Sequence, residues 1–329
     1  MNNGRLPLFA THIGVELTAR IGVLRARDQS GFEIFDDCEM QLIQGLAPEY
    51  DTLLRSGYNV KPQIDDDFCD FELTLVQITR SKVETQMLVA QAWNATRVGG
   101  RIVVDGQKTD GIESIFKYIR KLGIEPDGLV KAHGRLFWFD RTDANPFTAW
   151  LTPKLASPAG FTTAPGIFSA EKIDKGSQVL LENLPVLAGQ GADFGAGWGY
   201  LSRAVLQSDQ VEKLTLYEAE IAALNAAKQN ISDVRAAFEW TDLRGLSGQK
   251  FDFIVTNPPF HTERAANTDL GVAFLTAAAR NLKPKGQFFC VANRHLPYEA
   301  ALDELFRSVT EIGGTSAFKV FQASQPRRL

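Results

Sequence analysis

Residues 190–207, QGADFGAGWGYLSRAVLQ, decide the fold of the second half of the chain. They run from the end of an apolar strand through a glycine-rich turn into a helix. Residues 211–231, VEKLTLYEAEIAALNAAKQNI, repeat the step from strand to helix. Together the two segments predict successive βα units with parallel strands.

The rest of this half continues the alternation. Strand-like runs at 236–243, 250–257 and 287–293 are separated by the helix-like segment 271–282, with the turn KPKG at 283–286. Strands separated by helices predict a parallel sheet that is covered on both faces. Ligands of such sheets bind at the carboxyl ends of the strands.

The unusual residues of this half follow the predicted strands. In chain order they are Asp193, Gly195, Gly197, Gly199, Glu218, Asp242 and Asn257. Glycines let a ligand approach the backbone, and an acidic residue about twenty positions later can accept hydrogen bonds from ribose hydroxyls. A dinucleotide fits imperfectly, because Tyr200 stands where an NAD fingerprint has its third glycine. A purely structural turn is the other interpretation of the glycines. Because strand ends converge in a doubly wound sheet, these residues are predicted to meet in one crevice.

A rigid loop follows the fourth strand, in the segment IVTNPPFHTE at 254–263. Pro258 and Pro259 cannot donate backbone hydrogen bonds and fix their own φ, so they end the strand. A plain strand terminator would explain the prolines. It does not explain Asn257 before them and Phe260 after them, which favour a functional loop.

Length and composition restrict the class of protein. A chain of 329 residues exceeds the usual size of a single core, so two domains are expected. No apolar run is long enough to span a bilayer, and the start MNNGRLPLFA lacks the pattern of a signal peptide, so a cytoplasmic protein without membrane contact is expected. The three cysteines and four histidines lack paired spacing, which predicts buried, reduced thiols and no metal site. The net charge of −4 excludes a global basic field, so a nucleic-acid partner must contact a local patch.

A family resemblance rests on the motifs DFGAGWG, YE, TD and NPPF in this order and spacing. They resemble those of a Rossmann-like S-adenosylmethionine-dependent methyltransferase that modifies an exocyclic amine. The segment PGIFSAEKIDKGSQVLLENLP at 165–185 narrows the resemblance to the bacterial ribosomal RNA small subunit methyltransferase C family, which makes N2-methylguanine. The resemblance covers roughly residues 160 to 325. Trp198 departs from the small residue expected in the glycine turn.

The resemblance implies roles for the residues at the strand ends. Asp193 and the three glycines would line the methionine and ribose part of the cofactor. Glu218 would bind the ribose hydroxyls, Asp242 would approach the adenine amine, and Asn257 would border both cofactor and substrate.

The chemistry of an exocyclic amine explains the residue types of the NPPF loop. The amine is a poor nucleophile because its lone pair is delocalised into the ring. The Asn257 side-chain oxygen and the Pro258 carbonyl can accept hydrogen bonds from its two hydrogens and aim the lone pair at the methyl group. Phe260 can stack on the base, and Pro258 and Pro259 keep the acceptors rigid. No general base is required to begin the transfer.

The first half of the chain is interpreted as a degenerate copy of the second. FELTLVQ at 71–77 aligns with FDFIVTN at 251–257, and RVGGRIVVDG at 97–106 aligns with KPKGQFFCVA at 283–292. Duplication of a domain is the plausible cause, and two unrelated α/β domains are the alternative. The first copy has Gln77, Ile78 and Thr79 in place of Asn257, Pro258 and Pro259, and it has no glycine triplet followed by an acid. It is expected to bind no cofactor.

The predicted architecture is α/β, with two tandem Rossmann-like methyltransferase domains. Residues 1–150 form the degenerate domain without a cofactor site, and residues 151–329 form the catalytic domain. The segment 140–166, rich in Pro, Thr, Ala and Ser, is interpreted as the linker. Candidates for phosphate contacts, each of which could equally be solvated surface charge, are Lys131, Arg135, Arg141, Lys154, Arg294, Arg327 and Arg328.

The predicted function is transfer of a methyl group from S-adenosylmethionine to the N2 amine of a guanine in ribosomal RNA. The expected partner is ribosomal RNA or the small ribosomal subunit. Adenine-N6 and glutamine-amide methyltransferases use related Asn-Pro-Pro-aromatic loops and stay open as alternatives. A noncatalytic RNA-binding assembly factor with the same fold is the alternative from another class.

Overall fold

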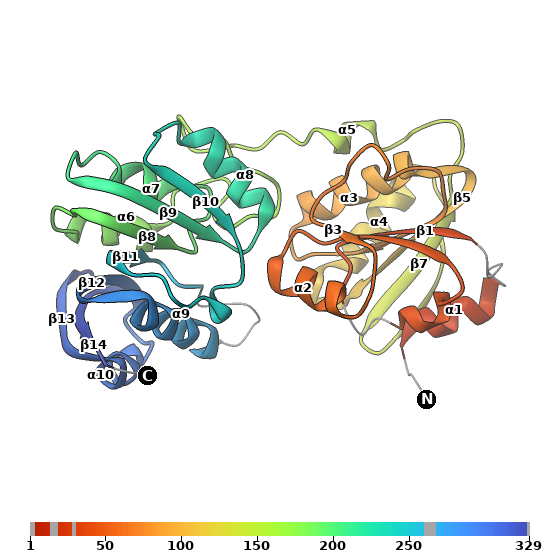
Figure 1. Ribbon diagram of the computed structural model, residues 1–329. Coiled ribbons are helices and arrows are strands. Elements are labelled where there is room, and N and C mark those ends of the chain that lie inside the picture. The colour runs from red at the N-terminus through yellow and green to blue at the C-terminus, as the bar shows by residue number, and fades with distance from the viewer. Residues whose placement is uncertain (1–3, 14–18, 28–30, 260–267, 328–329) are drawn as a thin grey trace. The chain divides into compact units, whose positions relative to one another are not determined.

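The computed structural model describes residues 4–13, 19–27, 31–259 and 268–327. The chain folds into two compact units, Met1–Leu155 and Ala156–Leu329. Each unit is built on one seven-stranded sheet accompanied by helices (Figure 1).

The first unit has the strand order β3-β2-β1-β4-β5-β7-β6. Its strands are β1 (Arg20–Leu24), β2 (Glu39–Ile43), β3 (Val60–Lys61), β4 (Phe71–Gln77), β5 (Thr96–Gln107), β6 (Asp127–Lys131) and β7 (Gly134–Asp140). Its helices are α1 (Arg5–Ile13), α2 (Ala47–Arg55), α3 (Lys82–Ala95), α4 (Ile112–Lys121) and α5 (Thr148–Leu151), with short 3-10 turns at η1 (Phe32–Phe35) and η2 (Lys108–Asp110).

The second unit has the equivalent strand order, β10-β9-β8-β11-β12-β14-β13. Its strands are β8 (Gly189–Phe194), β9 (Val211–Glu218), β10 (Ala236–Trp240), β11 (Phe251–Thr256), β12 (Leu282–Asn293), β13 (Phe306–Gly314) and β14 (Phe318–Pro326). Its helices are α6 (Lys175–Asn183), α7 (Tyr200–Val205), α8 (Ile221–Asn230), α9 (Thr268–Asn281) and α10 (Tyr298–Leu305), with the 3-10 turn η3 (Leu243–Gly245).

Both sheets are mixed, which corrects the prediction of a parallel sheet. In the second unit β10, β9, β8, β11 and β12 are parallel, whereas β14 is antiparallel to both of its neighbours. β13 and β14 are joined by residues 315–317 alone. A connection this short forms a hairpin, because a parallel pair needs a crossover of a dozen or more residues.

The segments that align in sequence occupy the same positions in the two sheets. β4 pairs with β5 as β11 pairs with β12, and a register irregularity falls at Phe71/Leu73 in one pair and at Phe251/Phe253 in the other. A shared irregularity in addition to a shared strand order is the pattern that duplication predicts, and it disfavours two unrelated domains.

The second sheet is buried on both faces. Successive residues of β11 enter different hydrophobic clusters: Ile254 packs with Phe194 and Phe288, and Val255 packs with Phe289. Central parallel strands covered by helices on both faces require such continuous apolar runs. Along β11 the polar side chains, Asp252 and Thr256, lie near the two ends of the strand.

Two aromatic residues of the predicted linker pack into the units, one into each. Phe147 is completely buried in a core of the first unit. Phe161 belongs to the second unit, where its ring centroid lies 4.8 Å from that of Trp198. The residues between Phe147 and Phe161 are half-buried or exposed.

The three cysteines are free thiols in three different environments. Cys290 is fully buried, and burial raises its pKa. Burial also raises the pKa of the half-buried Cys38. Cys69 is exposed, so the prediction that all three are buried is wrong for this residue.

Candidate active site

Three adjacent strands of the second sheet end together and carry most of the predicted site residues. Phe194, the last residue of β8, pairs with Tyr217 of β9 on one side and with Thr256 of β11 on the other. The next residues along these strands are Gly195, Glu218 and Asn257, so the sheet itself brings the three together.

The glycine turn between β8 and α7 needs three left-handed residues. Gly195, Gly197 and Gly199 have φ values of 74°, 55° and 90°. At Gly199 an added Cβ would lie 2.9 Å from Ile231, so this glycine serves helix packing. At Gly197 an added Cβ would meet no atom within 4 Å. The open side of Gly197 is where a ligand can reach the backbone.

Glu218 holds the glycine turn and keeps acceptor capacity. Its Oε2 accepts a hydrogen bond from Gly197 N at 2.8 Å, and its Oε1 accepts one from Glu220 N at 2.8 Å. Burial raises the pKa of this half-buried carboxyl, and backbone hydrogen bonds from Glu220, Gly197 and Ala219 oppose that effect. A carboxylate has about four acceptor positions, so two remain for hydroxyl donors.

Asp193 is completely buried in β8. Its Oδ2 accepts a hydrogen bond from Ser202 Oγ at 2.6 Å, and its buried Oδ1 has no partner among the residues that the structure describes. Burial raises the pKa of Asp193 to about 7, and the neighbouring charge of Glu218 acts in the same direction, while the Ser202 hydrogen bonds oppose it.

A neutral residue at position 193 should flatten the pH dependence of stability. Folding raises the pKa of Asp193 to about 7, so the folded state binds more protons than the unfolded state between about pH 4 and 7. The unfolding free energy therefore falls as pH rises through this window, by on the order of a few kcal/mol for this group. We expect Asp193→Asn to remove this part of the decline in a series of thermal melts from pH 5 to 8.

Asp233→Asn is the matched control for that series. The Arg235 hydrogen bonds lower the pKa of Asp233 to about 2, outside the window, so its removal should leave the slope between pH 5 and 8 unchanged. A wild-type slope in Asp193→Asn would contradict the assignment of the decline to Asp193.

The side-chain amide of Asn257 is held at one end only. Its Nδ2 donates to Asp174 Oδ2 and to Ser177 Oγ, both at 2.8 Å. Its Oδ1 is buried, and no described residue donates to it. An orphaned buried acceptor costs about 1–3 kcal/mol, so this oxygen is suited to a donor supplied by a ligand. Phe260, which was predicted to act beside it, lies outside the described residues.

A cavity of about 40 Å³ lies beside this amide. Of the predicted site residues within the described ranges, Gly195, Gly197 and Asn257 line it and the others do not. The remaining lining residues are Phe168, Ser169, Asp174, Ser177, Ala196, Trp198, Tyr200 and Leu201. Residues from Phe168 to Ser177 therefore form a wall of the site. The sequence of this stretch supports the family resemblance and predicts no site role for its residues.

Asp242 lies away from this cavity, after β10. Its Oδ1 accepts from Arg244 N at 2.9 Å, and its Oδ2 pairs with Arg244 Nη2 at 2.6 Å. Burial alone would raise the pKa of Asp242, but the Arg244 hydrogen bonds prevail and lower it. The carboxylate is thus ionised and caps the 3-10 turn η3.

Trp198 anchors the wall of the site to the glycine turn. Its side chain is buried, and its Nε1 donates to the carbonyl oxygen of Phe168 at 3.2 Å. Its ring contacts Phe161 and Tyr200 edge to face. The presence of tryptophan at position 198, where a small residue was expected, is therefore explained by these packing contacts and this hydrogen bond.

Most basic residues predicted to contact phosphate have partners within the protein. Arg135 pairs with Glu113 at 3.1 Å and lies over the ring of Phe116. Arg141 donates to the carbonyl oxygen of Thr96. Arg294 pairs with Glu311 at 2.8 Å, and Arg327 donates to the carbonyl oxygens of Asp303 and Phe306. Lys154 is exposed. Arg328 lies outside the described residues.

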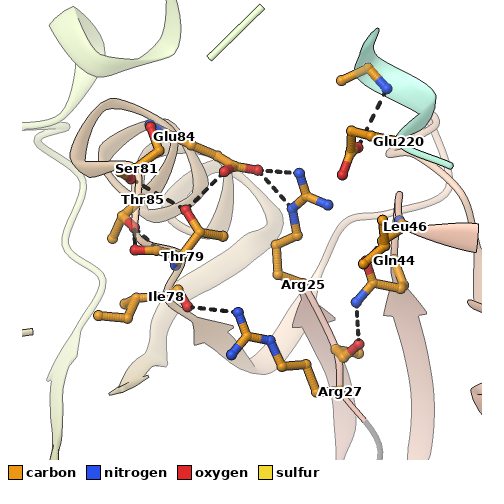
Figure 2. A network of polar contacts seen from close by, with 12 residues as sticks. Arg25, Arg27, Gln44, Leu46, Ile78, Thr79, Ser81, Glu84, Thr85 and Glu220 are labelled. Atoms are coloured by element: carbon orange, nitrogen blue, oxygen red, sulfur yellow. Dashed lines mark hydrogen bonds and ion pairs between the residues drawn. The ribbon is translucent and has the colours of Figure 1, made fainter. Parts of the chain in front are cut away.

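In the first unit the corresponding strand ends are filled by its own side chains. Arg25, with φ of 56°, follows β1 where Gly195 follows β8. Its guanidinium pairs with Glu84, which also accepts from Thr79 Oγ1 at 2.8 Å, as Figure 2 shows. Gln77 stands where the second unit has Asn257, and its Oε1 accepts from Arg27 N at 2.6 Å. The acceptor that is open in the second unit is occupied here.

The described ranges contain neither a metal-binding cluster nor a membrane-spanning helix. Within them, no group of three or more His, Cys, Asp or Glu side chains could hold a metal ion. None of their helices combines the length and the apolar character needed to cross a bilayer.

A matching family and two similar proteins all point to methyltransferases. Residues 158–322 match the methyltransferase small domain family. The protein named ribosomal RNA small subunit methyltransferase C of Shewanella pealeana is 30% identical and covers 79% of each chain. The protein of that name from Shewanella sp. strain MR-4 is 28% identical and covers 85% of this chain and 84% of its own.

One solved structure resembles both units. It is described as the T. thermophilus "16S rRNA N2 G1207 methyltransferase (RsmC) in complex with AdoMet and Guanosine". It matches with a TM-score of 0.83 and 25% identity, over 94% of this chain and 89% of its own. The likeness thus extends beyond the segment that the family match covers.

Proposed function

Because the chain belongs to the ribosomal RNA small subunit methyltransferase C family, we propose that it methylates the exocyclic N2 amine of a guanine in small-subunit ribosomal RNA. S-adenosylmethionine is the methyl donor. One observation carries the proposal beyond family membership: the buried, unpartnered Oδ1 of Asn257 beside the cavity at the glycine turn. This buried oxygen can accept a hydrogen bond from an amine of the substrate.

The residues at the strand ends fit S-adenosylmethionine, which supplies an electrophilic methyl group on a sulfonium when bound. The free side of Gly197 gives access to the backbone, and the remaining acceptor positions of Glu218 suit the ribose hydroxyls. Asp242 would face the adenine amine. The proposed cofactor set is Asp193, Gly195, Gly197, Gly199, Glu218 and Asp242, and Asn257 borders it on the side of the substrate without contributing much to cofactor affinity.

The NPPF loop would activate the guanine amine. Asn257 Oδ1 accepts from one N–H and the Pro258 carbonyl accepts from the other, which turns the nitrogen lone pair out of the base plane. Pro258 and Pro259 hold both acceptors in place before the substrate arrives, and Phe260 would stack on the base. The surplus proton of the methylated nitrogen passes to water, so no side chain has to act as the base.

The first unit would serve structure or RNA contact without a cofactor of its own. Support comes from Arg25 and Gln77, because a guanidinium follows β1 where the second unit has a glycine and the Gln77 oxygen is already bonded. We infer a cytoplasmic location from ribosomal RNA as the proposed substrate. A methylation assay with each of them distinguishes free RNA from the assembled small subunit as the substrate.

Nucleoside mapping by mass spectrometry tests the function. Ribosomal RNA from a strain without the protein should lack one N2-methylguanosine. Purified protein with S-adenosylmethionine should restore it on free RNA, on small subunits, or on both. A missing N6-methyladenosine would instead assign the adenine-specific alternative. An unchanged set of nucleosides alongside a defect in subunit assembly would favour a noncatalytic factor.

A further inference from the structure

We propose that Asp174 is a positioning residue, which turns the Asn257 amide so that its oxygen faces the reacting amine. The inference rests on the proposed function, in which that oxygen accepts a hydrogen bond from the substrate. Asp174 reaches Asn257 from another part of the chain, at the start of α6.

Asp174 has one partner that is near in sequence and one that is distant in sequence. Its Oδ2 accepts from Ser177 N at 2.9 Å and so caps α6. The same oxygen accepts from Asn257 Nδ2 at 2.8 Å, across 83 positions of sequence. One carboxylate oxygen thus fixes the helix start and the amide together.

The hydrogen-bond inventory of the Asn257 amide shows which partner decides its orientation. Both N–H groups are used, one by Asp174 and one by Ser177, and only Oδ1 is left. The Ser177 hydroxyl can donate or accept, so it tolerates either orientation of the amide. A carboxylate oxygen only accepts, so it would repel Oδ1 in the flipped orientation. Asp174 therefore selects the orientation.

Gly176 gives the two side chains room to meet. A Cβ at this position would lie 3.0 Å from Asp174 Oδ2 and 3.6 Å from Asn257 Nδ2. A side chain there would crowd the hydrogen bond between them. The sequence DKGS at 174–177 therefore supplies the acceptor, the space and the second acceptor in order.

Two substitutions at position 174 separate helix capping from positioning. Serine caps helices about as well as aspartate, but its shorter side chain does not reach the amide. Asp174→Ser should therefore melt close to wild type, yet lower kcat by about tenfold through loss of the fixed acceptor geometry. Asp174→Asn keeps an oxygen on Ser177 N and on Asn257 Nδ2, so its kcat should exceed that of Asp174→Ser by about fivefold or more.

The cofactor dissociation constant, measured by calorimetry, separates positioning from binding. A kcat for Asp174→Ser within twofold of wild type at saturating cofactor would overturn the proposal. A loss confined to cofactor affinity would overturn it as well, because Asp174 would then be a cofactor ligand.

The pH dependence of melting reads the same contact without any substrate. Asn257→Asp places two carboxylates where the structure has a 2.8 Å hydrogen bond, so one of them must have a raised pKa in the folded state. The folded state then binds the extra proton above about pH 4, and stability falls as pH rises through the raised pKa. Relative to wild type, the Tm of Asn257→Asp should drop by about 3 °C or more from pH 5 to 8.

The double variant Asp174→Asn/Asn257→Asp is the control for this measurement. It holds a single carboxylate at the contact, so the extra pH dependence should disappear. If the single and double variants have the same profile, the two positions are not in contact and the proposal fails. If the wild-type protein forms no N2-methylguanosine, the proposed function fails instead, and the melting series still reports on the contact.

Discussion

Replacing Asn257 with alanine should lower kcat at least about a hundredfold and leave cofactor affinity almost unchanged. The physical reason is the orphaned Oδ1, which is buried and accepts no hydrogen bond from the described residues. Its acceptor strength becomes useful only when the amine nitrogen changes toward a tetrahedral geometry. An interaction of this kind lowers the barrier without tightening the binding of the methyl donor.

Single-turnover kinetics with saturating cofactor, together with calorimetry, would measure the two effects separately. Asn183→Ala is the matched control, because this asparagine lies at the other end of α6 and donates to the Val179 carbonyl at 2.8 Å. It should retain wild-type kcat. Asn257→Asp is not a conservative test, since Asp174 lies at hydrogen-bond distance and would face a second carboxylate. An Asn257→Ala enzyme with wild-type kcat would refute the acceptor role.

The residues at the strand ends could be predicted from sequence because their meeting is a property of the sheet. Any residue that follows β8, β9 or β11 arrives at the same edge, whatever the side chains elsewhere. Gly197 and Glu218 were placed in one crevice on this ground alone, and the structure joins them by a 2.8 Å hydrogen bond. The positions of these residues after successive strands are enough to predict that they lie close together.

Asp174 could not be found in the same way. The DKGS pattern predicts a helix cap, but a cap acts within three residues and says nothing about Asn257, 83 positions away. The contact depends on how α6 packs against β12 and β14, which no local pattern encodes. The antiparallel direction of β7 and β14 could not be predicted for a related reason, because a run of apolar residues does not indicate the direction of a strand.

The partners of the basic residues could not be predicted from the sequence either. Arg135 is a charge in the sequence, and only the fold shows that Glu113 and Phe116 already bind its guanidinium. Reversing its charge would place two carboxylates together and would disturb the first unit as well as any RNA contact. Candidate RNA contacts are therefore better sought among lysines without ion pairs in the described structure, such as Lys172 and Lys175, which are exposed on either side of Asp174.

Replacing Gly197 with valine should abolish detectable binding of S-adenosylmethionine, a loss of about a hundredfold or more in affinity. The backbone at Gly197 has φ of 55°, and the space that a Cβ would enter holds no atom within 4 Å. In the folded protein alone the Cβ of the valine therefore meets no clash. It fills the volume through which the cofactor reaches the turn, and its branched side chain disfavours the left-handed backbone that presents Gly197 N to Glu218.

Gly248→Val separates these two effects, because Gly248 also has a left-handed backbone, with φ of 85°, and also has open space at its Cβ. Both variants carry the same strain, on the order of 1–3 kcal/mol, and should lose similar thermal stability. Only Gly197→Val should lose the heat of cofactor binding, and only its Tm should stop rising when S-adenosylmethionine is added, because a ligand stabilises the state that it binds. If both variants bound the cofactor equally well, the open side of Gly197 would not be its path to the backbone, and the glycine triplet would be a structural turn.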